Sequence, residues 1–177
     1  MMKWLNEPPV WRIDGGAVTV TAAAKTDFWR KTHDGGLRHS GHFYYQEVTG
    51  DFTAQVKVAG QYADLYDQAG LMVRLDEATW LKCGIEFVNG VQYASSVVTR
   101  DWSDWAIRPL DNPAAIWLRV VRHGGTLEVF VSTDGSRFDM IRQAYLSDEP
   151  TLAVGLMIAA PTGTGFTARF DDVRIDQ

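Results

Sequence analysis

Two charged residues, Lys82 and Glu86, stand four positions apart in the segment Trp80–Phe87. This segment alternates like a β-strand, in which successive side chains point to opposite faces. The alternation places Leu81, Cys83, Ile85 and Phe87 on one face, and Trp80, Lys82, Gly84 and Glu86 on the other. Burying charges costs free energy unless they pair or serve a ligand. The second face therefore predicts the floor of a site in which Lys82 and Glu86 hydrogen-bond a polyol or another polar metabolite.

A structural explanation of the same two residues stays open. Lys82 and Glu86 would then form an ion pair on a partly solvated sheet, which contributes about 0–1 kcal/mol. We favour ligand binding because strand parity places Arg74, Trp117 and Arg119 on the face opposite the core pattern as well. Small residues on that face would leave a depression between the large side chains; these are Gly84, Ala153 and Gly155.

Aromatic residues in polar segments predict the rim of this groove. A tryptophan ring suits the apolar face of a sugar, and three tryptophans have polar neighbours: Trp29, Trp102 and Trp105. The alternative is that each of them plugs an end of the fold, and we expect at least one to face the ligand. Asp104 lies between two of them, and a strand starting at His42 would bring His42 and Tyr44 to the groove.

An enzymatic function would need two groups with separated pKa values. Glu86 with Asp104, or with Asp67 or Asp101, would provide two carboxylates for glycoside cleavage. The chain contains no Gly-x-Ser-x-Gly motif, no phosphate loop and no dinucleotide fingerprint, so we expect no cofactor. We also expect no metal, because the clustered histidines lack a carboxylate or thiol at ligand spacing; these are His33, His39 and His42.

Composition excludes several classes of function. A net charge of -5 without a run of Lys or Arg argues against nucleic-acid binding. No apolar run approaches the ~20 residues that span a bilayer, and the first residues lack a signal-peptide pattern. We therefore expect a cytoplasmic protein without membrane contact. The single cysteine, Cys83, falls on the apolar face of its strand and predicts a buried, unreactive thiol.

Short alternating runs separated by Gly-containing turns predict an all-β fold, either a sandwich or a barrel. Asn89-Gly90 between two such runs is the strongest short signal for a hairpin. A second hairpin is predicted over residues 127–138, with its turn at 132–136. No linker or low-complexity segment divides the chain, so residues 1–177 are predicted to form a single domain.

Three segments carry a resemblance to a known family: Asp67–Arg74, Trp80–Glu86 and Ser103–Trp105. They are similar to an uncharacterised concanavalin A-like family of bacteria and fungi, whose fungal members are described as regulators of enolase. The resemblance implies a concanavalin A-like β-sandwich, or jelly roll, of two antiparallel sheets, the fold of legume lectins and many glucanases. The glucanase Glu-x-Asp motif and the metal-binding loop of the lectins are absent. The resemblance therefore implies the fold and says little about activity, because this fold hosts many functions.

These observations predict a protein that binds a carbohydrate or small polar metabolite in a concave groove without metal. Two alternatives from other classes remain. One is a glycoside-active enzyme that uses Glu86 with an Asp carboxylate. The other is a protein-interaction module whose groove face meets a partner, or a second copy of the chain in a homodimer.

Overall fold

The computed structural model describes residues 1–177 and contains strands and loops but no helix. Its sixteen strands are β1 Lys3–Leu5, β2 Val10–Asp14, β3 Ala17–Thr21, β4 Phe28–Arg30, β5 Leu37–His39, β6 His42–Thr49, β7 Phe52–Gly60, β8 Gln68–Arg74, β9 Thr79–Val88, β10 Val91–Arg100, β11 Trp102–Pro109, β12 Ile116–His123, β13 Thr126–Ser132, β14 Asp139–Tyr145, β15 Thr151–Ala159 and β16 Thr167–Asp176. The predicted all-β class is confirmed. The structure has no helix long and apolar enough to cross a membrane.

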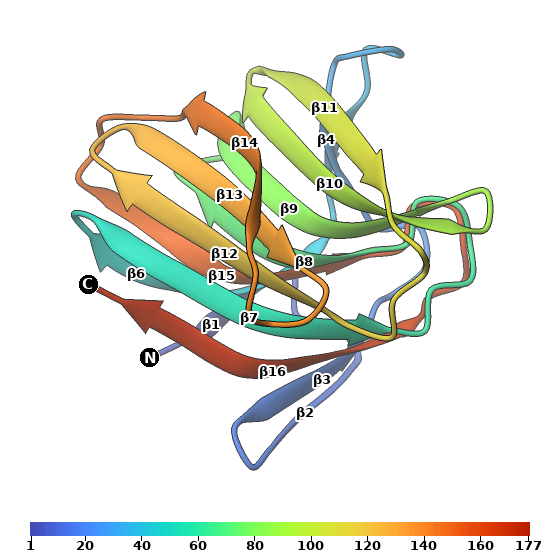
Figure 1. Ribbon diagram of the computed structural model, residues 1–177. Helices are drawn as coiled ribbons and strands as arrows, with labels where there is room; N and C mark the ends of the chain where they lie inside the picture. Colours follow the sequence, from blue (N-terminus) through green and yellow to red (C-terminus); the bar gives the residue numbers. More distant parts are fainter.

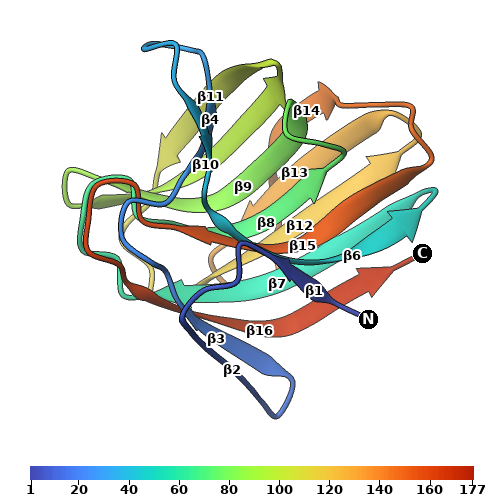
Figure 2. The same ribbon diagram turned by 180° about the vertical axis from the view of Figure 1, so that it is seen from behind.

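Fourteen of the strands form two antiparallel sheets that pack face to face (Figures 1 and 2). Sheet A has the order β1-β6-β15-β8-β9-β10-β11, and sheet B has the order β14-β13-β12-β7-β16-β3-β2. Strands β4 and β5 form a separate two-stranded hairpin, seen from the sheet A side in Figure 2. The predicted sandwich of two antiparallel sheets is therefore confirmed.

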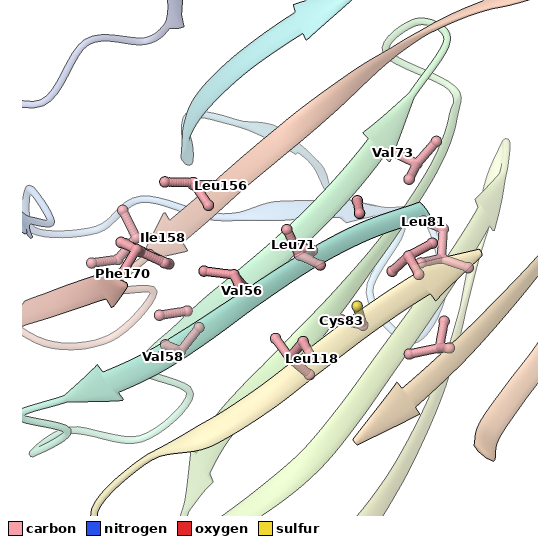
Figure 3. Packing of buried hydrophobic residues seen from close by; sticks show 14 of the residues in the cluster. Val56, Val58, Leu71, Val73, Leu81, Cys83, Leu118, Leu156, Ile158 and Phe170 are labelled. Carbon is pink, nitrogen blue, oxygen red and sulfur yellow. The ribbon is translucent and has the colours of Figure 1, made fainter. Parts of the chain in front are cut away.

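The core lies between the two sheets and is built by the apolar faces predicted from alternation. Leu71 and Cys83 of sheet A point toward Val56, Leu118 and Phe170 of sheet B (Figure 3). All five belong to one cluster of 31 buried residues. Because the odd-numbered residues of β9 enter this core, its even-numbered residues must lie on the opposite, outer face of sheet A.

The Asn89-Gly90 turn joins β9 to β10 as predicted. Both turn residues have positive φ, 50° at Asn89 and 85° at Gly90, which is the geometry of a type I′ hairpin turn. Val88 is paired with Val91 directly before and after the turn. The second predicted hairpin, between β13 and β14, is also present, and it turns over residues 133–138.

Cys83 is expected to resist thiol reagents in the folded protein. Its side chain is 2% exposed, and burial raises the pKa of the thiol to about 12. Both effects suppress reaction, because the thiolate is the nucleophile and must be reached by the reagent. Labelling with a maleimide should be negligible under native conditions and complete in denaturant. Rapid native labelling would show that the faces of β9 have been assigned the wrong way round.

Candidate functional site

The polar residues of β9 lie on the outer face of sheet A, as the alternation predicted. Strand register places Gln68 of β8 on one side of Glu86 and Tyr93 of β10 on the other. One step along the strands, Gly70, Gly84 and Ser95 form the next row. The outer face thus carries a band of polar and small residues across three adjacent strands.

The β4–β5 hairpin covers the neighbouring half of this face. Phe28 is buried against Trp80, with ring centroids 6.3 Å apart. The backbone N–H of Arg30 donates to Ser103 Oγ of β11 over 2.9 Å. An apolar cluster is closed off beneath the hairpin, formed by Phe28, Phe43, Met72, Trp80, Val97 and Met157. The hairpin therefore leaves open the half of the outer face that contains Glu86.

Lys82 fastens the hairpin to the sheet. Its ammonium group donates to the Phe28 carbonyl oxygen and to Gln68 Oε1, each over 2.6 Å, and lies 3.5 Å from Asp27 Oδ1. The ammonium group thus makes two hydrogen bonds and one ion pair, all with the protein. Lys82 was predicted to hydrogen-bond a ligand, whereas in the structure its partners belong to the hairpin, to the loop before it and to β8.

Glu86 has a different environment on the same strand. Its side chain is buried, with the residue 7% exposed, and Oε2 accepts a hydrogen bond from Ser95 Oγ over 2.7 Å. Trp105 Nε1 donates to the same Ser95 hydroxyl over 3.2 Å. Burial raises the pKa of the Glu86 carboxyl, and the charge of Lys82 offsets part of this rise. The Ser95 hydroxyl and the Trp105 indole also lower the pKa of Glu86, and Oε1 opens toward solvent.

A small depression with a cavity volume of about 10 Å³ lies in front of this carboxylate. Its polar and apolar lining includes Gln68, Lys82, Gly84, Glu86, Ser95 and Met157, and we call it the Glu86 depression. Trp105 stands nearby with 38% of its surface exposed, and its ring meets that of Tyr66 edge to face at 6.1 Å. Small-molecule pockets typically measure about 300–1,000 Å³. The depression is therefore far smaller than a ligand pocket and admits about one small group, such as a hydroxyl or an ammonium group.

Three other predicted residues lie away from the depression. Arg74, at the end of β8, is half-buried and makes no ion pair, and burial lowers the pKa of its guanidinium. Trp102 is exposed and lies 5.7 Å from the Lys31 ammonium in a cation–π contact. Trp29 donates from Nε1 to the Thr32 carbonyl within its own loop. Of the three tryptophans, Trp105 stands beside Glu86.

The predicted convergence of Trp117 and Arg119 with Glu86 is wrong. Both lie on β12 in sheet B and point away from the sandwich core. Lys57 stacks over Trp117 at 5.0 Å, and the Arg119 guanidinium lies 3.9 Å from the Phe138 ring centroid. Strand parity separates the two faces of one strand, but it does not tell which sheet the strand joins.

The placement of His42 and Tyr44 in the groove is also wrong. Both point into the space between the sheets, where Tyr44 packs against Trp4 with ring centroids 4.8 Å apart. His42 Nε2 accepts a hydrogen bond from the Ala23 N–H, so Nδ1 carries the proton and donates to the Asn6 carbonyl over 2.6 Å. Burial lowers the pKa of this imidazole. His42 therefore joins two N-terminal segments to β6.

Glu86 and Asp104 do not form a catalytic pair. Asp104 pairs in register with Val98, a core residue, and its carboxylate forms an ion pair with Arg142 of β14 at 3.0 Å. Asp67 is likewise turned inward and is fully buried. Asp101 is held by Arg30 and Lys31 at the turn end of the β4–β5 hairpin. The carboxylate that does influence Glu86 is that of Asp27, whose charge raises the pKa of Glu86.

Several residues of the site were not predicted: Asp27, Tyr66, Gln68, Tyr93 and Ser95. The sequence did contain a signal for Tyr93 and Ser95, the register of the β9–β10 hairpin. Extending the register outward from Asn89-Gly90 pairs Glu86 with Tyr93 and Gly84 with Ser95. Asp27 carries no such signal, because it enters the site from the loop before β4 rather than from sheet A.

The exchange Glu86→Gln is expected to stabilise the unliganded protein at neutral pH. Because burial raises the pKa of Glu86 in the folded state, its contribution to stability is largest at acidic pH and is lost as the carboxylate ionises. Glutamine keeps the shape and can still accept from Ser95. We expect a gain of about 0.5–2 kcal/mol at pH 7, measured by urea denaturation. The gain should shrink toward pH 4, and a loss at pH 7 would mean that Glu86 serves chiefly as a structural partner of Lys82.

Two facing antiparallel sheets with a polar depression on one outer face define a concanavalin A-like β-sandwich protein. Within that class, the chain belongs to the family described as protein of unknown function (DUF1349), whose model matches residues 4–177. It is 42% identical over 170 residues to "Regulation of enolase protein 1" of Saccharomyces cerevisiae, covering 96% of this chain and 86% of that protein. It is also 30% identical over 124 residues to the uncharacterized protein AN7484 of Emericella nidulans, covering 67% of this chain and 58% of that protein.

Solved structures share the same architecture. A functionally unknown protein of Saccharomyces cerevisiae superposes with a TM-score of 0.95 at 40% identity, covering 98% of this chain and 95% of that one. A GH43 protein of Bacillus licheniformis gives a TM-score of 0.79 at 17% identity, covering 99% of this chain but 36% of that one. The carbohydrate binding module CBM66 of Bacillus subtilis gives 0.64 at 13% identity, covering 98% and 95%. At such low identity the last two matches concern the fold alone.

Proposed function

We propose that the protein binds a carbohydrate by placing one substituent of a sugar unit in the Glu86 depression. The observation that carries this proposal is the Glu86 carboxylate itself. It is buried, and one of its oxygens is fixed by Ser95. Oε1 is not fully buried and opens toward the depression, where a hydroxyl group of a ligand can donate to it.

The aromatic residues beside Glu86 suit the other side of a sugar. A pyranose presents an apolar C–H face with hydroxyls at its edge, and an exposed tryptophan is a good surface for that face. Trp105 supplies such a surface, and its Nε1 is already fixed by Ser95. Tyr93 lies next to Glu86 in register and adds a second ring.

The β4–β5 hairpin favours one sugar unit over a long chain. It closes the half of the outer face around Trp80, so a polysaccharide could not lie across the whole sheet. The depression itself, at about 10 Å³, admits a single substituent of a sugar. A terminal unit that rests beside Trp105 and directs one substituent toward Glu86 fits these limits.

The fold comparisons support a carbohydrate ligand in general terms. Two of the structures with this fold are a carbohydrate binding module and a GH43 protein. The name of the yeast relative points to a regulatory process. A sugar-binding protein without its own catalytic pair is compatible with the fold comparisons and with a regulatory process.

Binding can be tested with a panel of monosaccharides and short oligosaccharides, using thermal shift followed by calorimetry. A ligand at 100 times its Kd raises stability by about 2.7 kcal/mol. Trp105→Ala should weaken binding about tenfold, because a stacked aromatic ring contributes roughly 0.5–1.5 kcal/mol beyond its buried area. Trp117→Ala on sheet B is the matched control and should leave the affinity unchanged. Equal losses in both variants, or no ligand in the panel, would contradict the proposal.

A further inference from the structure

We infer that the Glu86 depression selects sugars that carry a protonated amino group over the corresponding neutral and acidic sugars. This inference rests on the proposed function, and it concerns which class of sugar the same site prefers. The preference follows from the charges and the hydrogen-bonding groups around Glu86.

The charges around Glu86 do not balance. Two carboxylates, those of Asp27 and Glu86, lie near one ammonium, that of Lys82. The ammonium forms its ion pair with Asp27 at 3.5 Å, and no cation forms an ion pair with Glu86. The remaining groups beside Glu86 are uncharged: Gln68, Tyr93 and Ser95. When Glu86 ionises, the depression therefore gains a negative charge that the protein does not compensate.

The hydrogen-bond donors and acceptors around Glu86 do not balance either. Gln68 accepts from Lys82 through Oε1 and donates from Nε2 to the Tyr66 carbonyl over 3.1 Å. Ser95 gives its hydroxyl proton to Glu86 and accepts from Trp105. One N–H of Gln68 Nε2 is thus left without a protein acceptor, and Oε1 of Glu86 is an acceptor open to the depression. A ligand that brings donors suits Oε1, and an ammonium group brings three together with a positive charge.

An acidic sugar is disfavoured both by its charge and by its hydrogen-bonding groups. Its carboxylate brings acceptors where the site already has an acceptor, and its charge has the same sign as that of Glu86. A cation also gains from the aromatic rings next to Glu86, because ammonium groups are attracted to the faces of Trp and Tyr rings. The preferred order is therefore amino sugar, then neutral sugar, then uronic acid.

The test uses matched ligands and the full chain. Calorimetry would give Kd values for glucosamine, glucose and glucuronate, and for the three galactose counterparts, between pH 5 and pH 7. At pH 7 at least one amino sugar should bind about tenfold more tightly than its neutral counterpart. Its affinity should fall as the pH decreases, since protonated Glu86 no longer attracts the ammonium. Affinity for the neutral sugar should change little over this range.

Glu86→Gln provides the second arm, with its fold checked by circular dichroism. It should remove the preference for the amino sugar, so that an amino sugar and its neutral counterpart bind this variant with equal, weakened affinity. If a neutral sugar binds at pH 7 as tightly as its amino counterpart, the inference is overturned and the proposed function stands. If no sugar of either series binds, the proposed function fails and the inference with it. The pH series on the unaltered protein decides the question independently of this variant.

Discussion

Lys82→Met is expected to lower the free energy of unfolding by about 3–5 kcal/mol, the range typical of breaking a buried ion pair from one side. Methionine fills a similar volume but cannot donate. The carbonyl oxygen of Phe28 and Oε1 of Gln68 would lose their donor, and Asp27 would lose its cation. The loss can be measured by urea denaturation, with unchanged m-values as a check on the comparison.

Two further variants make this expectation specific. Lys57→Met on the outer face of sheet B removes an exposed cation–π contact with Trp117 and should change stability by about 1 kcal/mol at most. Adding Asp27→Asn to Lys82→Met should restore part of the loss, because the unpaired carboxylate disappears. Hydrogen exchange should also accelerate in residues 28–39 of the Lys82 variant. A Lys82→Met protein as stable as the unaltered chain would show that the hairpin is held mainly by Phe28.

Gly70→Ala is expected to destabilise the protein by about 3 kcal/mol or more, at the upper end of the range for overpacking. A Cβ atom at Gly70 would lie 1.9 Å from the backbone oxygen of Cys83 and 2.6 Å from the Cα atom of Gly84. These are backbone atoms in the middle of sheet A, so they can withdraw only if β8 and β9 separate. Thermal unfolding followed by circular dichroism measures the effect.

Gly36→Ala is the matched control for this exchange. A Cβ atom at Gly36 would meet the guanidinium of Arg38, the far end of a flexible side chain that can move aside. The same substitution should therefore change the melting temperature little at Gly36. Similar melting temperatures for the two variants would mean that β8 and β9 are not as close at Gly70 as the structure shows.

The fold was predictable because its signals are local and repeated. Alternation in Trp80–Phe87 assigned Cys83 to the core and Glu86 to the outer face, and Asn89-Gly90 fixed one hairpin. Each of these depends on residues close together in the sequence. Register follows from a tight turn, and the side of the sheet follows from a period of two.

The site was only partly predictable because its assembly depends on contacts that are distant in sequence. Trp117 and Glu86 share the same kind of alternation, yet β12 and β9 belong to different sheets. Asp27 reaches Lys82 through a hairpin that crosses the sheet, which no periodicity describes. His42 and Tyr44 were placed on one face correctly, but that face proved to be the inner one. The alternation of residues along a strand defines its two faces, but packing against the rest of the protein decides which face is buried.

The strand order has a consequence for the synthesis of this chain. The last two strands, β15 and β16, do not lie at the edges but inside the two sheets, where β15 joins β6 to β8 and β16 joins β7 to β3. Until residues 151–176 leave the ribosome, neither sheet can close, and the long edges of β6, β8 and β7 stay unpaired. Such edges invite pairing with other chains, and nonlocal pairing is slow. Newly made chains should therefore need shielding by chaperones until the end of the chain emerges, and loss of these strands should lead to aggregation rather than to a smaller folded protein.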